Sequence, residues 1–290
     1  MTPRQRAAGL SLWSGPVEPM PLSGGITNAN FVVADRGRRY FVRIGDDIPV
    51  HGILRWHELA ASRAAAAAGI SPAVVHHEPG AVVFDFIDGK TLTADAVRSQ
   101  TMLARILPLV RSCHRELPKR FRGAVLMFWV FQVCRDYART LTDCGSRMVP
   151  DLPRLMTAAE TLEAAVGPID VVFGHNDLLA GNFIDDGKRL WLIDWDYAGA
   201  NSPLFDLGNL CSNNDVAEAD ERWLLESYFE RPAGDELWRR YRAMKCASLL
   251  REAMWSMVAE HHSTLDFDYV AYTDGYLARF QREFEQIPRS

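Results

Sequence analysis

One stretch near the middle of the chain constrains its fold more than any other. It runs from residue 173 to residue 196 and reads FGHNDLLAGNFIDDGKRLWLIDWD. Two short apolar segments flank the run Asp185–Lys188, which predicts a tight turn and therefore a β-hairpin. The hairpin would bring Asn182 and Asp194 together at its open end, with Asp177 on the loop just before it. The stretch therefore predicts that two carboxylates and one amide oxygen converge.

Such a set of side chains suits phosphoryl transfer. Carboxylate and amide oxygens are hard ligands, which Mg²⁺ prefers and zinc does not. A kinase needs the metal to neutralise the phosphates and one carboxylate to orient the attacking hydroxyl. Protein kinases carry these parts in H-R-D-x-x-x-x-N and D-F-G. Here His175 precedes Asp177, Asn182 follows five residues later, and Asp194 comes next. The arginine and a recognisable A-P-E motif are missing, which favours a kinase of small metabolites over a regulated protein kinase.

The flanking segments predict an α+β, two-lobed, protein-kinase-like fold. Alternating apolar residues predict short strands at 31–33, 40–44, 73–75 and 81–86. Longer apolar periodicity predicts helices over 53–68, with Gly69 as C-cap, and over 92–117, 126–141, 155–166 and most of 220–285. We therefore expect a β-rich nucleotide-binding lobe over 1–89 and a larger, mostly α-helical catalytic and substrate-binding lobe over 90–290.

Composition narrows the class of protein further. The chain has 290 residues, enough for two lobes around a cleft, and its net charge of -5 does not favour nucleic acid. Its five cysteines lack zinc or redox spacing, so we expect reduced thiols. The apolar run 125–133 is shorter than a membrane span and predicts a buried helix, and the N-terminus lacks a signal-peptide pattern. We expect a cytoplasmic protein with no nucleic-acid partner and no membrane span.

Three motifs carry a family resemblance. HNDxxxGN at 175–182, IDWDYAG at 193–199 and FDLGN at 205–209 resemble the choline/ethanolamine kinase family, within the superfamily that includes aminoglycoside phosphotransferases. The likeness extends over most of the chain, and its central motif is highly specific. It implies an ATP- and Mg²⁺-dependent kinase whose acceptor is a small amino alcohol such as choline or ethanolamine.

The resemblance also implies roles for single residues. Asp177 is similar to the catalytic base, and Asn182 and Asp194 resemble the Mg²⁺ ligands. Asp196 stands where the family has a further acidic residue, and both a metal role and a capping role stay open for it. Residues implied to contact the nucleotide are Ser23, Gly24, Gly25, Thr27, Asn28, Arg43 with its tether Glu58, and Phe84, Phe86 and Ile87 of the hinge.

The acceptor site is implied to include Asp177 and four residues of the helical lobe. Aligning the motifs places Asn213 where eukaryotic relatives have a glutamate, Trp255 on one of their two pocket tryptophans and Glu252 on the other. Glu252 and Trp255 are i and i+3, so they should share a helix face, and Tyr272 would form another wall. Aromatic faces attract a quaternary ammonium, whereas a carboxylate accepts hydrogen bonds from a primary one. We therefore expect ethanolamine to compete better here than in those relatives.

Other functions stay open on the sequence alone. The acceptor could instead be thiamine, an amino sugar or an aminoglycoside, because fold and catalytic apparatus do not determine the acceptor. A nucleotide-binding pseudokinase is the non-enzymatic alternative, and the chain could form a homodimer. Two residues of the motifs are expected to be structural. His175 should hydrogen-bond the backbone near Asp194, and Asp206 should anchor a loop or cap a helix.

Overall fold

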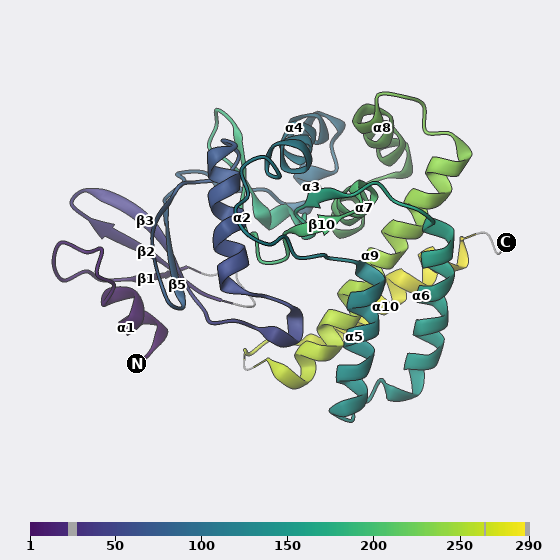
Figure 1. Ribbon diagram of the computed structural model, residues 1–290, viewed down its shortest axis with the longest axis horizontal. Helices are drawn as coiled ribbons and strands as arrows, with labels where there is room; N and C mark the ends of the chain where they lie inside the picture. The colour runs from purple at the N-terminus through teal and green to yellow at the C-terminus, as the bar shows by residue number, and fades with distance from the viewer. Residues whose placement is uncertain (23–27, 264, 288–290) are drawn as a thin grey trace.

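The N-terminal part is a five-stranded antiparallel sheet. The computed structural model describes residues 1–22, 28–263 and 265–287 (Figure 1). The strands follow the order β1-β2-β3-β5-β4. They are β1 (Met20–Leu22), β2 (Ala29–Asp35), β3 (Arg38–Ile44), β4 (Val74–Glu78) and β5 (Ala81–Asp85). The four strands predicted from residue 31 onward are therefore confirmed.

The two faces of this sheet have different tasks. On β3, Tyr40, Val42 and Ile44 are buried in a small core that α1 (Pro3–Ala8) helps to form. Because side chains alternate along a strand, Phe41 and Arg43 lie on the opposite face, where both line a cavity. The helix α2 (Arg55–Ala67) stands between the sheet and the helical part of the chain (Figure 1). One strand therefore supplies both core packing and a buried charge to the cleft.

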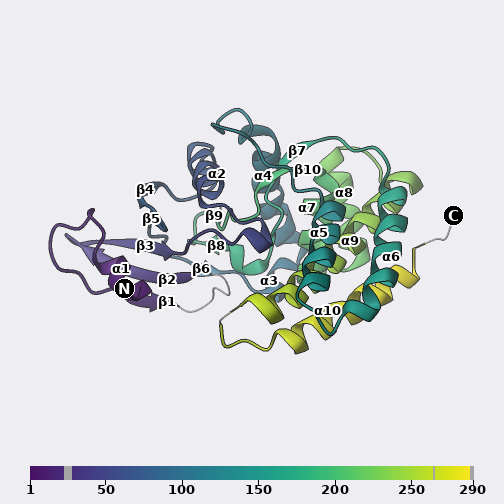
Figure 2. The same cartoon turned by 60° about the horizontal axis from the view of Figure 1, so that its bottom comes forward.

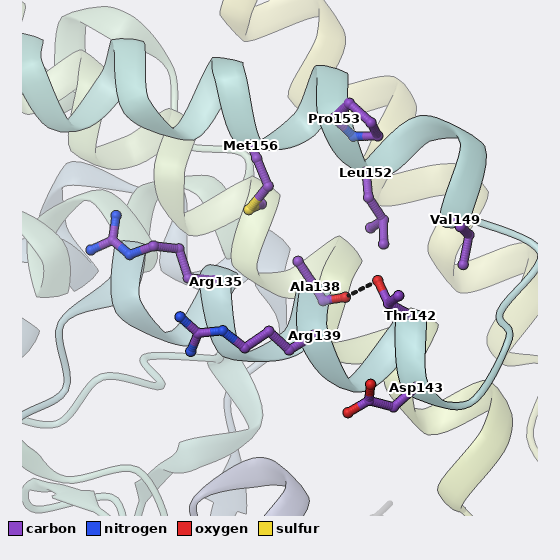
Figure 3. Close-up of a pocket in the computed structure, with 9 residues that line it drawn as sticks. All are labelled: Arg135, Ala138, Arg139, Thr142, Asp143, Val149, Leu152, Pro153 and Met156. Carbon is purple, nitrogen blue, oxygen red and sulfur yellow. Dashed lines mark hydrogen bonds between the residues drawn. The ribbon is translucent and has the colours of Figure 1, made fainter.

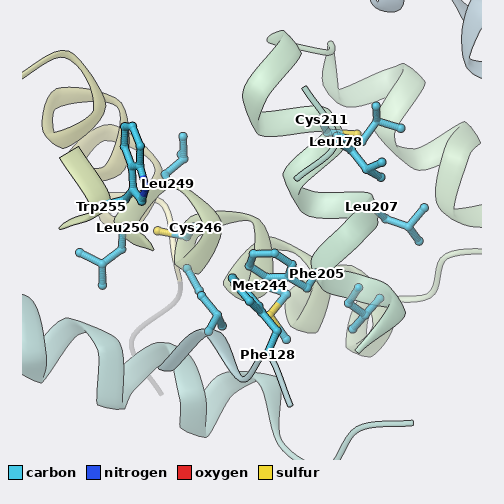
Figure 4. Packing of buried hydrophobic residues seen from close by; sticks show 14 of the residues in the cluster. Phe128, Leu178, Phe205, Leu207, Cys211, Met244, Cys246, Leu249, Leu250 and Trp255 are labelled. Carbon is cyan, nitrogen blue, oxygen red and sulfur yellow. The ribbon is translucent and has the colours of Figure 1, made fainter. Parts of the chain in front are cut away.

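The helical part is built around one long helix, α9. Figures 1 and 2 show α9 surrounded by α5, α6, α7 and α10, and all four contact it. Side chains from α9 and α7 interlock with Phe128 and Leu178 in the core (Figure 4). The bounds are α5 (Val130–Asp143), α6 (Leu152–Val166), α7 (Pro203–Asn214), α8 (Glu218–Phe229), α9 (Asp235–His262) and α10 (Tyr269–Glu285).

The single helix predicted over 92–117 is wrong, because the structure has two. They are α3 (Ala94–Val97) and α4 (Gln100–Glu116). Thr93 accepts a hydrogen bond from the backbone N–H of Ala96, and Ser99 accepts one from that of Met102. Each hydroxyl caps a helix N-terminus, so the chain begins a second helix at Ser99.

The helix predicted to begin at residue 126 begins at Val130 instead. Before it, the chain is extended and pairs with Ala200, which accepts from the N–H of Phe128 at 2.9 Å and donates to the carbonyl of Leu126 at 2.8 Å. Met127, inside the run predicted to be a buried helix, is 56% exposed. Pairing with a distant segment overrides local helix propensity here.

Two small sheets lie between the larger units. β7 (Val172–Gly174) pairs with β10 (Gly199–Asn201), and the other sheet has the order β6-β8-β9. The hairpin predicted around residues 185–188 is confirmed, since β8 (Phe183–Asp185) pairs antiparallel with β9 (Leu190–Leu192). β6 (Lys90–Thr91) pairs with β8, so from residue 90 the chain belongs to the small sheet beside the helices. The division into lobes 1–89 and 90–290 stays a prediction.

Two further expectations concern the whole chain. All five cysteines are free thiols. Among the helices that the structure describes, none combines the length and the apolar character needed to cross a membrane.

Candidate active site

The loop from His175 to Leu178 is attached to the helix α7. The carboxylate of Asp206 accepts hydrogen bonds from the backbone N–H of His175 at 2.8 Å and from that of Asn176 at 2.7 Å. One turn further along α7, Asn209 accepts from the N–H of Leu178 at 2.5 Å. The expectation that Asp206 anchors a loop is confirmed. Asn209 was not predicted, although the FDLGN motif contains it.

Two residues of the site hold strained backbone conformations. Asn176 has φ +66° and Asp194 has φ +68°, in a region that residues with a Cβ rarely adopt. Such conformations persist only when surrounding contacts hold them, and they cluster at functional sites. For Asn176 those contacts include its Nδ2, which donates to the carbonyl of Tyr197 at 2.9 Å. The loop is therefore held in one geometry by its neighbours.

Asp177, Asn182 and Asp194 converge at the open end of the hairpin. Asn182 Nδ2 donates to the Asp177 carbonyl at 2.8 Å and lies 3.3 Å from Asp177 Oδ2. The backbone N–H of Ile193 donates to the carbonyl of Asn182 at 3.0 Å, which places Asp194 beside it. The His175 ring donates to the carbonyl of Ile193 at 2.9 Å, so its expected structural role is confirmed.

The oxygens at this point are suited to a hard cation. Since the Asn182 amide nitrogen is already used, its Oδ1 is the atom left for a ligand. Asp194 Oδ1 is buried and has no hydrogen-bond partner among the residues that the structure describes, although Arg43 Nη2 lies 3.2 Å away. No group of three or more His, Cys, Asp or Glu side chains in the described part of the chain could hold a metal by itself. A cation here would need oxygens from a bound phosphate as well, as Mg²⁺ in nucleotide sites does.

Arg43 lies at the centre of a buried charge cluster. Its guanidinium forms an ion pair with Glu58 on α2 and contacts Asp194 at 3.2 Å and Asp196 at 2.9 Å. Arg43 and Glu58 are 6% and 1% exposed, so both charges are stabilised by partners rather than by water. The contact between Arg43 and its expected tether Glu58 is present.

A second arginine, Arg55, completes this cluster and was not predicted. Its guanidinium contacts Glu58 Oε2 at 2.7 Å, Asp196 Oδ1 at 2.9 Å and Asn28 Oδ1 at 2.7 Å. Asn28 Nδ2 also donates to Asp196 Oδ2 at 3.2 Å. In this structure both oxygens of Asp196 are therefore engaged by protein groups. The sequence does contain a pattern that predicts this contact. Arg55 precedes Glu58 by three positions on one helix, and side chains at this spacing are neighbours.

Burial and neighbouring charges change the proton affinity of the carboxylates. Burial raises the pKa of Asp177 to about 8, while the charge of Arg251 opposes this shift and Glu252 adds to it. Burial also raises the pKa of Asp194, against the opposing charge of Arg43. A carboxyl group with a pKa near neutrality can accept a proton efficiently at physiological pH.

A mostly apolar cavity of about 190 Å³ leads to this cluster. Phe41, Phe84 and Ile193 line it from the sheet and the hairpin, and Phe86 and Ile87 line it from the segment between β5 and β6. Arg43, Glu58 and Asp194 line the same cavity, so its polar part is the charge cluster. The cavity brings the predicted hinge and the predicted phosphate-contacting arginine together. Ser23, Gly24, Gly25 and Thr27 lie outside the described residues.

Three of the predicted acceptor residues, Glu252, Trp255 and Tyr272, lie together. Tyr272 Oη donates to Glu252 Oε1 at 2.8 Å, and the Tyr272 and Trp255 rings lie 6.2 Å apart, so Glu252 and Trp255 do share a helix face. The other oxygen of Glu252 accepts from Arg251 at 2.8 Å. Glu252 is only 5% exposed and has a partner on each oxygen. The side-chain atoms of Asn213 are buried without a hydrogen-bond partner in the described structure, and no contact joins them to this group.

Arg251 is the unexpected member of this region. It is 1% exposed, and its guanidinium lies 4.3 Å from the centre of the Tyr197 ring and pairs with Glu252. The ion pair makes this part of the site closer to neutral than Glu252 alone would. No pattern in the sequence predicts this, because a charged residue on a helix is normally expected to face solvent.

A separate hollow lies between α5 and α6 (Figure 3). Arg135, Arg139 and Asp143 border it, and Leu152 and Met156 form its apolar floor. None of the residues predicted for the site lines it. The catalytic candidates are therefore confined to the cleft between the sheet and the helices.

Comparison with known proteins shows the family of the chain. The sequence pattern of the family described as choline/ethanolamine kinase matches residues 20–223. An ethanolamine kinase of Drosophila melanogaster is 29% identical over 255 residues, which cover 73% of this chain and 48% of that protein. The chain thus spans about half the length of this relative.

Solved structures match nearly the whole chain. A choline/ethanolamine kinase family protein from Mesorhizobium loti has a TM-score of 0.75 and 29% identity, covering 98% of this chain and 94% of that one. The choline kinase LicA from Streptococcus pneumoniae has a TM-score of 0.79 at 22% identity, covering 97% of each chain. These matches confirm the predicted kinase-like fold. The chain therefore belongs to the choline/ethanolamine kinase family of small-molecule kinases.

Proposed function

We propose that this chain is an ATP- and Mg²⁺-dependent kinase that phosphorylates the hydroxyl group of a small amino alcohol, choline or ethanolamine. The observation that carries the proposal is the arrangement of Asp177, Asn182 and Asp194 beside Arg43, at the polar side of an apolar cavity. Family membership supports the same chemistry.

Asp177 is assigned as the base that orients the acceptor hydroxyl and takes its proton. It is tied to Asn182, it lies on a loop held by α7, and its raised pKa suits a proton acceptor. A positioned base needs this kind of fixed geometry, because misplacement by about 1 Å can cost roughly 10²-fold in rate.

Asn182 Oδ1 and Asp194 are assigned to hold Mg²⁺. Bound there with the nucleotide phosphates, the ion would neutralise negative charge that develops during transfer. Asp196 has a different task in this proposal. Since Arg43, Arg55 and Asn28 engage its oxygens, it holds the two arginines in place beside the phosphates.

Nucleotide binding is assigned to the apolar cavity and Arg43. Phe41, Phe84 and Ile193 would enclose the adenine, and the chain at Phe86 and Ile87 would hydrogen-bond its edge. Arg43, held by Glu58, would contact the phosphates. The assignment of Ser23, Gly24, Gly25 and Thr27 to the nucleotide stays a prediction from the sequence.

The acceptor is assigned to the region around Trp255 and Tyr272, with Asp177 at its inner end. The aromatic rings attract a cationic headgroup. Glu252 and Arg251 form a buried pair behind these rings, so Glu252 shapes the site through its contacts with Arg251 and Tyr272.

The direct test is nucleotide consumption. Purified protein with ATP and Mg²⁺ should release ADP in the presence of choline or ethanolamine, and mass spectrometry should detect the phosphorylated amine. Thiamine, glucosamine and kanamycin complete the panel of acceptors. Turnover only with one of these three would contradict the amino-alcohol assignment, and nucleotide binding without turnover on any acceptor would support a pseudokinase.

A further inference from the structure

A second cavity, of about 350 Å³, lies between the segment after β3 and the C-terminal half of α9. Trp255 and Tyr269 line it from the helical part, and Asn28 and His51 line it from the other side. None of the described residues that line it is acidic. A cation in this cavity would therefore depend on ring faces and neutral polar atoms for its contacts.

Two residues that line the cavity hydrogen-bond the segment after β9. Asn28 hydrogen-bonds Asp196, whose partners include Arg43 of the charge cluster. Trp255 Nε1 donates to Tyr197 Oη at 2.9 Å, and the backbone carbonyl of Tyr197 accepts from Asn176, the residue before the proposed base. Hydrogen bonds therefore connect the lining of this cavity to the segment 194–197, which carries the proposed metal ligand Asp194.

His51 is one of the polar side chains that line this cavity, together with Asn28, His262 and Ser263. It belongs to the short 3-10 helix Pro49–His51, and its ring centre lies 5.3 Å from that of Trp255 at an interplanar angle of 33°. His51 Nδ1 lies 3.2 Å from Oη of Tyr137, a buried residue of α5. Across the described residues, Nε2 at the far edge of the ring has no hydrogen-bond partner. Nε2 is thus the atom available to a ligand.

The imidazole is uncharged under physiological conditions. Burial lowers the pKa of His51 to about 3, and the charges of Arg251 and His262 contribute to the decrease. The Arg251 charge is itself offset by its ion pair with Glu252. A neutral ring has a π face and, on the nitrogen without hydrogen, a lone pair that accepts hydrogen bonds.

We propose that His51 is an acceptor-binding residue that selects amines carrying an N–H group, so that ethanolamine is preferred to its trimethylated analogue choline. The inference rests on the proposed function of the chain as an amino-alcohol kinase. An ammonium in the cavity favours the tautomer in which Nδ1–H donates to Tyr137, because the Nε2 lone pair then faces the cation. Choline has no N–H and gains only the ring face. His51 also supplies an aromatic ring beside Trp255 and Tyr269. This ring would compensate for the tryptophan that eukaryotic relatives have at the position of Glu252.

Two substitutions separate a role in binding from a role in packing. His51→Asn keeps an amide near the position of Nδ1, and so the contact to Tyr137, but removes Nε2. His51→Gln places its amide near the position of Nε2. The test compares each variant with the unaltered protein. Steady-state kinetics gives kcat/KM for ethanolamine and choline, and calorimetry gives the dissociation constants of both amines. His261→Asn is the matched control, since this exposed histidine on the same helix end as Trp255 does not line the cavity.

We expect His51→Asn to lower kcat/KM for ethanolamine by about 10- to 100-fold, the value of a hydrogen bond to a charged group. The value for choline should fall by only about two- to fivefold, because choline loses the ring face alone. His51→Gln should retain part of the ethanolamine preference. An equal loss for both amines in both variants, or no loss in His51→Asn, would overturn the inference and leave the kinase assignment intact. If the unaltered protein phosphorylates neither amine, the proposed function fails, and calorimetry still decides whether His51 discriminates between them. Thermal melting shows whether each variant is folded.

Discussion

The three carboxylates Asp177, Asp194 and Asp196 lie close together but have unequal partners. Asp196 is paired with Arg43 and Arg55, and Asp177 contacts the amide of Asn182. Within the described part of the chain, Asp194 has one buried oxygen without a hydrogen bond. The neighbours of each aspartate therefore determine its chemical role.

Replacing Asp177 with Asn should nearly abolish turnover and leave nucleotide binding intact. The amide keeps the shape of the side chain but cannot accept the proton, and loss of a positioned base costs on the order of 10² to 10⁴ in rate. Steady-state kinetics gives kcat, and calorimetry with ATP and Mg²⁺ gives the nucleotide affinity. A variant with near-normal kcat would remove Asp177 from the mechanism.

Replacing Arg43 with Ala should raise the KM for ATP more than the KM for the acceptor. Arg43 is held at the cavity by Glu58, Asp194 and Asp196, so its loss removes charge on the nucleotide side of the cleft. Arg38→Ala is the matched control, because Arg38 lies on the same strand but is exposed and paired with Asp85. If only the acceptor KM rises, Arg43 belongs to the other side of the cleft.

At the scale of elements, the helix α7 holds the catalytic loop through Asp206 and Asn209. The crossing of α7 and α9 is close enough that a Cβ on Gly208 would lie 2.9 Å from the Cα of Lys245. This close approach requires glycine, and it keeps α7 rigid against α9. The position of the catalytic loop therefore depends on packing in the core.

Replacing Asp206 with Asn should lower both stability and kcat. The carboxylate accepts from two backbone N–H groups and from His114, and an amide oxygen can serve only part of this set. A buried donor left unpaired costs about 1–3 kcal/mol of the free energy of unfolding. Urea denaturation measures this loss, with the exposed Asp170→Asn as control. A variant as stable and as active as the unaltered protein would contradict the anchoring role.

At the scale of the whole molecule, the active site lies where the β-rich and helical parts meet. Arg43 comes from the sheet, Glu58 from α2, and Asp194 and Asp196 from the segment after β9. The ion pairs that connect these elements are buried, so each charge depends on partners supplied by the other part. A nucleotide that contacts both parts should stabilise the folded chain as a unit.

ATP with Mg²⁺ should therefore raise the melting temperature, and Asp194→Ala should abolish the shift. At a ligand concentration of 100 times Kd, binding stabilises the folded state by about 2.7 kcal/mol. Removing the metal with EDTA should reduce the shift in the unaltered protein, because the triphosphate charge is then uncompensated near Asp194. Differential scanning fluorimetry measures each case. A full shift in Asp194→Ala, or one insensitive to EDTA, would contradict the metal assignment.

Local sequence by itself determined four strands of the N-terminal sheet, the hairpin and the spacing of Asp177, Asn182 and Asp194. A tight turn fixes which residues meet at the open end of a hairpin, so these placements need no knowledge of the rest of the fold. The motifs also determined the family, because each is a short run of neighbouring residues that can be identified without the fold. The tertiary structure alone decided the partners of Asp196, the pairing of Arg251 with Glu252, the start of α5 and the place of His51 against Trp255. Each of these depends on a contact between segments far apart in the chain, and such contacts arise only when the two parts pack together.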